Sequence, residues 1–198
     1  MEVLFGITGK DFALLAADTN QARSIVVLKR GEDRTVDLNR HTALAYTGDP
    51  GDAIHFTEYI AANVRLNEIR HGHEASPNAV AKYTRNALAG YLRTRQAYHI
   101  NMLIAGVDKT SGAPALYWSD HLANMTALPF AAHGYASYFC MSTMDRLWRP
   151  NLTLEEAIIV LQKCVAALKT RFVASLPEFK VKVIDKSGIR VIDVKFEK

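Results

Sequence analysis

The chain lacks the features that would place it in a membrane or in a disulfide-rich fold. Its 198 residues include only two cysteines, Cys140 and Cys164, without a metal-ligand spacing, which predicts reduced thiols in a core. No apolar run approaches the ~20 residues that span a bilayer. The N-terminus has no basic segment followed by an apolar run and a cleavage site, so no signal peptide is expected. The sequence therefore predicts a soluble globular protein of the cytosol or nucleus with no membrane partner.

Concentrated charge is also missing. The formal net charge is +4, but the basic residues are scattered in pairs such as Lys29-Arg30. No basic cluster is interleaved with aromatic residues in the way that stacks bases and neutralises a nucleic-acid strand. We interpret these charges as solvated surface and expect no nucleic-acid partner.

What the sequence does contain is a regular order of strands and helices. Short apolar segments bounded by turn residues predict strands at 3–8, 12–17, 24–28, 35–38, 42–47, 99–107, 115–119, 122–127, 179–184 and 189–196. Longer apolar stripes predict helices at about 52–70, 76–95, 135–148 and 153–177. Strands grouped with strands and helices with helices favour an α+β fold in one domain, 1–198, with packed sheets and outer helices.

Two helix starts carry specific signals. Ser76-Pro77 combines an N-cap side chain with proline at the first helical position. Thr153 and Glu156 have the spacing of a capping box, in which each side chain accepts from the other's backbone N–H. These local signals fix where two of the helices should begin.

Familiar catalytic and metal motifs are absent. The sequence holds no Gly-x-Ser-x-Gly elbow, zincin motif or P-loop. His71-x-His73 with Glu74 has metal-ligating residue types, but no third cluster accompanies it, and we interpret it as a solvated loop. No cofactor and no metal are expected.

The first eighteen residues are the most informative segment. They predict two strands around a Gly9-Lys10-Asp11 turn, ending in Ala16-Ala17-Asp18, with Gly48 about thirty residues further on. This order resembles the start of a mature β subunit of the proteasome, a family of N-terminal-nucleophile hydrolases. Further segments carry the resemblance across the chain: 61–64, 70–77, 98–106, 129–135 and 184–189. The resemblance implies a four-layer αββα sandwich.

The resemblance also assigns the family's catalytic positions. Active members begin with a nucleophilic threonine whose own α-amine, with a pKa of about 8, serves as base. Glu2 falls at the nucleophile position, and Met1 is expected to be retained before it. Asp18 matches the family's aspartate, and Gly48 matches the glycine whose backbone N–H holds the oxyanion. Arg34 replaces the family's lysine and cannot deprotonate.

The remaining positions of the family's site are also altered. His133 lies where active members have a serine-containing loop, Ser175 matches a late serine, and Phe172 stands where an aspartate is expected. Cleavage before Thr8 would expose a threonine but would remove half of the first strand. The resemblance therefore implies no catalytic residue. The alternative to a catalytic role for Glu2 is a solvated terminal carboxylate near a vestigial pocket.

The function that the resemblance implies is architectural. Within the family the chain is similar to the non-catalytic subunit at the fourth position of the β ring. Its partners would be the β subunits at positions three and five, the α ring and the facing β ring, in the cytoplasm and nucleus. An atypical active hydrolase and a stand-alone binding module are the alternatives.

Two surfaces are expected from the pattern. The helix at 135–148 carries more apolar area than one buried stripe needs, including Tyr138, Met144 and Trp148, which predicts an interface. The terminal hairpin alternates charged and apolar residues. Its valines, including Val183, are predicted to lie in the core, and its charges, including Lys182, at the surface.

Overall fold

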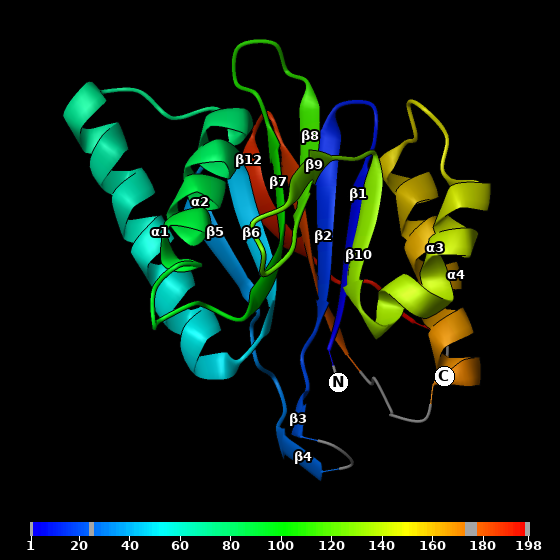
Figure 1. Cartoon of the computed structure of the whole chain (residues 1–198). Coiled ribbons are helices and arrows are strands. Elements are labelled where there is room, and N and C mark those ends of the chain that lie inside the picture. Colours follow the sequence, from blue (N-terminus) through cyan, green and yellow to red (C-terminus); the bar gives the residue numbers. More distant parts are fainter. Residues whose placement is uncertain (1, 24–25, 173–177, 197–198) are drawn as a thin grey trace.

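Two five-stranded sheets lie face to face, and a pair of helices covers the outer face of each (Figure 1). This computed structural model describes residues 2–23, 26–172 and 178–196. All strand pairings in both sheets are antiparallel. The α+β class and the four-layer αββα sandwich are therefore confirmed. In the described part of the chain, no helix is both long and apolar enough to cross a bilayer.

The elements have the following bounds. The first sheet is ordered β10 (Phe130–Gly134), β1 (Val3–Thr8), β2 (Phe12–Asp18), β11 (Phe179–Asp185) and β12 (Gly188–Ile192). The second is ordered β5 (Thr35–Asn39), β6 (Thr42–Gly48), β7 (Ile100–Val107), β8 (Pro114–Ser119) and β9 (Met125–Ala127). A separate hairpin pairs β3 (Gln21–Arg23) with β4 (Val26–Lys29). The helices are α1 (Pro50–His71), α2 (Pro77–Tyr91), α3 (Tyr135–Leu147) and α4 (Leu154–Arg171).

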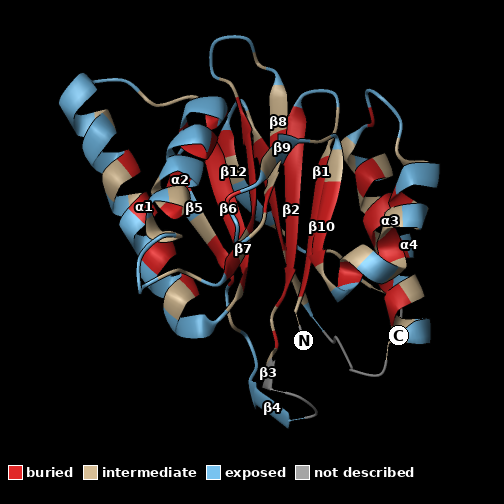
Figure 2. Cartoon of the chain, viewed as in Figure 1, coloured by how far each residue is buried: buried red, intermediate tan, exposed pale blue. Residues whose placement is uncertain are grey.

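Three apolar layers hold the sandwich together. In β1, Val3 and Phe5 join the layer under α3 and α4, whereas Leu4 between them joins the layer between the two sheets. The third layer packs α1 and α2 on the second sheet through side chains such as Phe56. Buried residues accordingly line both sheets and the inward sides of the helices (Figure 2). A strand that is buried on both faces reads as a continuous apolar run, which is why 3–8 and 12–17 stand out in the sequence.

The predicted helix starts at Ser76-Pro77 and Thr153 are confirmed. The Ser76 hydroxyl accepts from the backbone N–H of Ala79, and Thr153 and Glu156 form the capping box. α1 begins at Pro50, two residues before the prediction, because Asp49 caps it. α2 ends at Tyr91, four residues before the predicted end.

The strand predictions missed two segments. β10 was not predicted as a strand, and it pairs with β1 at the sheet edge. β3 was also not predicted, and it forms with β4 a hairpin that projects below the sandwich (Figure 1). Residues 24 and 25, which were predicted to be strand, lie outside the described residues.

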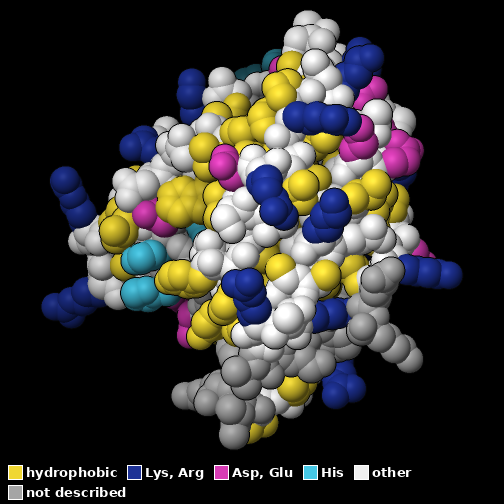
Figure 3. All heavy atoms as spheres, turned by 90° about the vertical axis from the view of Figure 1, so that its right-hand side faces the viewer, with side chains coloured by type: hydrophobic (Ala, Val, Ile, Leu, Met, Phe, Trp, Pro, Cys, Tyr) yellow, Lys and Arg dark blue, Asp and Glu magenta, His cyan; other side chains and the backbone are white. Residues whose placement is uncertain are grey.

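The prediction for the helix at 135–148 was wrong for most of its apolar side chains. Met144 is fully buried, and Trp148 packs against the same core and donates from Nε1 to the Thr8 carbonyl at 3.0 Å. Tyr138 and Tyr135 are the exceptions, with 84% and 41% of their surfaces exposed. On the face that α3 and α4 form, hydrophobic side chains lie between scattered lysines and arginines (Figure 3). The external apolar area of α3 is therefore narrow and centred on tyrosine.

The terminal hairpin was predicted correctly for Val183 and wrongly for one valine and one charge. Val191, predicted in the core, is 56% exposed. Val183 is fully buried under α3 and α4, as expected. Lys182, predicted at the surface, is 5% exposed, and its Nζ lies 2.7 Å from the Asp37 carboxylate. Because β11 is an interior strand of its sheet, its alternate residues point toward the second sheet, and this lysine reaches an ion pair there.

Candidate functional site

Four of the residues singled out in the sequence meet at one end of the sandwich. Glu2 precedes β1, Asp18 ends β2, Arg34 precedes β5 and Gly48 ends β6. Backbone or side-chain contacts join all four into one cluster. The N-terminal end of the chain lies at this end of the sheets, next to the β3–β4 hairpin (Figure 1).

Asp18 is the buried anchor of the cluster. Its Oδ1 accepts from the Val3 backbone N–H at 2.8 Å and from Arg34 Nη1 at 2.7 Å. Its Oδ2 has no hydrogen-bond partner among the residues that the structure describes. Burial raises the pKa of Asp18 to about 6, although Arg34 and the Val3 N–H both favour the charged form. The carboxylate ties the first strand to the second sheet.

Arg34 is almost completely enclosed, with 3% of its surface exposed. In addition to its bond with Asp18, its Nη2 donates a short hydrogen bond to the Asn20 carbonyl. The same nitrogen lies 3.6 Å from Glu2 Oε1. A guanidinium stays charged in a protein, so this side chain supplies a permanent positive charge and never a base. Sequence reasoning did not identify Asn20, because its contribution is a backbone carbonyl.

Gly48 supplies a fixed backbone donor. Its φ of +140° is a conformation that side-chain-bearing residues rarely adopt, and a Cβ there would lie 2.1 Å from the His99 carbonyl oxygen. The Gly48 N–H donates to Glu2 Oε2 at 2.9 Å. The Glu2 side chain is 20% exposed. The expectation of a solvated terminal carboxylate was therefore wrong, because the side chain is bound inside the cluster.

Little space remains around these groups. The cavity beside them measures about 20 Å³, which is room for about one water molecule. Tyr46 and Glu32, which sequence reasoning did not identify, also line it. Burial raises the pKa of Tyr46, so its hydroxyl stays protonated at neutral pH. Within the described ranges, no group of three or more His, Cys, Asp or Glu is placed to hold a metal ion.

His133 does not join the cluster through its side chain. It lies between the sheets, stacked on Trp118 with ring centroids 4.9 Å apart. Its Nε2 lies 3.1 Å from the Met102 carbonyl oxygen. Burial lowers the pKa of His133 to about 4, so the neutral ring donates from Nε2 to that carbonyl. Ser175 lies outside the described residues.

The other candidates have structural surroundings. Phe172 packs against Tyr135, with ring centroids 4.8 Å apart, and offers no acid. The Thr8 hydroxyl donates to the Pro129 carbonyl within paired strands. Glu74, expected in a solvated loop, was misjudged, because its carboxylate binds both the backbone N–H and Nδ1 of His41 at 2.8 Å.

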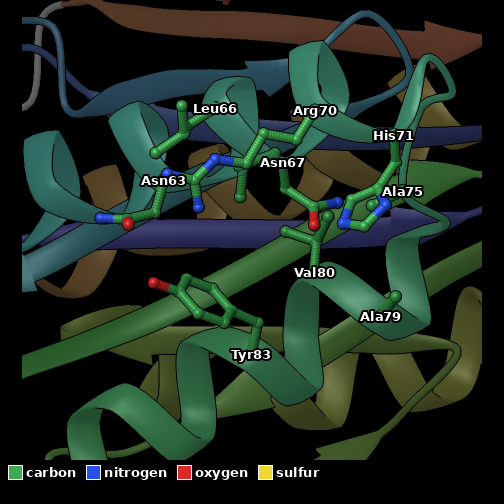
Figure 4. Close-up of a pocket in the computed structure, with 10 residues that line it drawn as sticks. Asn63, Leu66, Asn67, Arg70, His71, Ala75, Ala79, Val80 and Tyr83 are labelled. Atoms are coloured by element: carbon green, nitrogen blue, oxygen red, sulfur yellow. The ribbon is translucent and has the colours of Figure 1, made fainter.

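A larger hollow lies away from this cluster, between α1 and α2. It measures about 350 Å³ and shares no lining residue with the cavity beside Glu2. Arg70 and Leu66 from α1 face Tyr83 and Val80 from α2 across it (Figure 4). Its walls combine apolar side chains with the polar side chains of Asn63, Asn67, Arg70 and His71.

Comparison with known proteins agrees with the fold. The family described as "Proteasome subunit" matches residues 2–184. A Neurospora crassa protein named "Probable proteasome subunit beta type-4" is 43% identical over 197 residues, covering 100% of this chain and 96% of that protein. The "Proteasome subunit beta type-4" of Saccharomyces cerevisiae is 39% identical over 193 residues, covering 98% of each chain. The "Proteasome subunit beta type-2-B" of Arabidopsis thaliana is 43% identical over 190 residues, covering 96% of this chain and 94% of that protein. Full-length similarity of this extent, on a sandwich of this architecture, shows that the chain belongs to the proteasome subunit family.

Proposed function

We propose that this chain is a non-catalytic β subunit that fills the fourth position of the β ring in the 20S core particle. The observation that supports this most directly is the contact between the Glu2 carboxylate and the Gly48 N–H at 2.9 Å. In active members a threonine hydroxyl would stand at the first position, and the glycine N–H would face the oxyanion. In this chain, the Glu2 carboxylate accepts the hydrogen bond from the Gly48 N–H.

The chemistry of the cluster is consistent with an inactive site. The carboxylate that accepts from the Gly48 N–H offers no hydroxyl for acyl transfer. Arg34 cannot take a proton from a nucleophile. The cavity of about 20 Å³ beside Gly48 is much smaller than a peptide segment.

The role that remains is architectural. In this proposal the chain is one domain that supports its catalytic neighbours and encloses part of the proteolytic chamber used in ATP- and ubiquitin-dependent degradation. Its contacts are with the β subunits at positions three and five, the α ring and the facing β ring. It acts in the cytoplasm and nucleus.

A covalent threonine-directed inhibitor tests the proposal on the intact particle. Mass spectrometry of the separated subunits should find the inhibitor on neighbouring subunits and not on this chain. Labelling of this chain would favour the alternative of an atypical active hydrolase. A second test measures the native mass of the species that contains this chain in a cell extract. Co-migration with a very large particle is expected, and migration as a stable monomer would refute the architectural role.

A further inference from the structure

We propose that Gly48 and Arg34 form a binding site for small carboxylates, and that this chain's own Glu2 side chain keeps the site filled. Gly48 ends β6, Arg34 precedes β5, and both face one carboxylate. Glu2 Oε2 accepts from the Gly48 N–H at 2.9 Å, and Glu2 Oε1 lies 3.6 Å from Arg34 Nη2. Glu2 is thus an intramolecular ligand. Because its side chain is a carboxylate, the ligands expected at this site are carboxylates.

The donors are held in place by contacts that do not involve Glu2. The Gly48 N–H has a fixed direction, because only glycine fits its backbone conformation against the His99 carbonyl. The Arg34 side chain is 3% exposed and is held by Asp18 and by the Asn20 carbonyl. Removal of the Glu2 carboxylate would therefore leave a preorganised pair of donors, and preorganisation lowers the cost of binding a new ligand.

Nearby charges set how tightly such a ligand binds. Arg34 already shares its charge with Asp18, and the Glu32 carboxylate also lines the cavity, with Lys29 as its ion-pair partner. These acids oppose a second anion, so a free carboxylate should bind weakly. The Glu2 carboxylate binds despite this repulsion because it is covalently part of the chain. The next residue, Val3, is fixed to Asp18 by its backbone N–H, and an intramolecular group has a high effective concentration.

The size of the site follows from the atoms that Glu2 places in it. Substitution by alanine removes the last methylene and the carboxylate, which are the atoms of acetate. Substitution by glycine removes one carbon more, which gives the atoms of propionate. Each variant therefore has a matched probe that restores the missing atoms.

A consequence for the particle rests on the proposed function. Peptide products released into a proteolytic chamber carry terminal carboxylates. Because Glu2 fills the site, this subunit does not retain such products at its inactive centre.

The test is a titration of the purified full chain with small carboxylates. Binding is monitored through the Gly48 amide resonance in ¹H–¹⁵N spectra. Glu2→Ala is titrated with acetate and Glu2→Gly with propionate, against chloride at equal ionic strength. We expect a saturable shift of the Gly48 amide in each variant, at least about tenfold tighter than any in the wild-type chain, since one charge-assisted hydrogen bond separates them. Glu58→Ala, which removes an exposed glutamate of α1, should behave as wild type.

Absence of a carboxylate-specific shift in both variants would overturn the proposal, as would an equal shift in the wild-type chain. If neither variant folds in chloride, refolding yields in propionate and chloride decide instead. A higher yield in propionate supports the site, and equal yields refute it. Inhibitor labelling and native mass do not depend on this titration, so the proposed function and this inference fail separately.

Discussion

Asp18→Asn is expected to remove a pH dependence that the wild-type chain shows in acid. Burial raises the pKa of Asp18 from 3.8 to about 6 in the folded chain, so the folded state holds this proton more tightly than the unfolded state. The stabilisation that comes from the bound proton is complete below pH 3.8 and is lost as the pH rises through about 6. Well above pH 6, Asp18 makes no further contribution to the pH dependence of the unfolding free energy.

The size of the effect follows from the shift. A difference of about two pKa units between folded and unfolded states corresponds to about 3 kcal/mol of unfolding free energy. Asparagine keeps an oxygen acceptor for the Val3 N–H and Arg34 but does not titrate in this range. The unfolding free energy of wild type minus that of Asp18→Asn should therefore fall by about 2.4 kcal/mol between about pH 4 and about pH 7, which is most of the full effect.

Urea unfolding of both chains across this range provides the measurement, and the subtraction cancels all groups that the two chains share. The ¹³C resonance of the Asp18 carboxyl in the folded wild type should titrate near pH 6. Glu2→Gln should lower that midpoint, because the Glu2 charge is among the causes that raise the pKa of Asp18. A difference that stays constant with pH, or a carboxyl that titrates at or below 3.8, would refute the reasoning.

Other substitutions separate core from surface. Val183→Asp should abolish soluble expression, because it buries an unpaired charge under α3 and α4, and a wild-type yield would contradict this. Tyr138→Asp should keep the wild-type circular dichroism but reduce incorporation into the particle, as measured by sedimentation. Met144→Asp should fail to fold, because that side chain is fully buried. Glu2→Ala should leave particle peptidase rates unchanged, whereas a tenfold loss, about 1.4 kcal/mol of barrier, would make Glu2 catalytic.

Several elements could be predicted from the sequence because their signals are local. The capping box of Thr153 and Glu156 and the Ser76-Pro77 start act within three residues, so they are legible in the printed chain. The apolar runs of β1 and β2 indicate strands in the same way. The family resemblance at the N-terminus then indicated how these elements pack.

Which neighbour covers each apolar side chain could not be predicted in the same way. The sequence of α3 is apolar on more than one side, and it does not say that Met144 faces the core while Tyr138 faces outward. Lys182 looks like a surface charge in an alternating strand. It is buried because β11 lies inside its sheet, where its partner Asp37, 145 residues away in the chain, can reach it.

For the candidate site, too, the sequence predicted one part and the tertiary structure decided the other. The sequence, through its resemblance, predicted that Glu2, Asp18, Arg34 and Gly48 stand at the family's catalytic positions. Only the tertiary structure decided that the Glu2 carboxylate binds the Gly48 N–H, 46 residues away, and that Asn20 helps to hold Arg34. The physical reason is that a hydrogen bond depends on angstrom-scale positions, which here are set by the pairing of strands within each sheet and the packing of one sheet on the other.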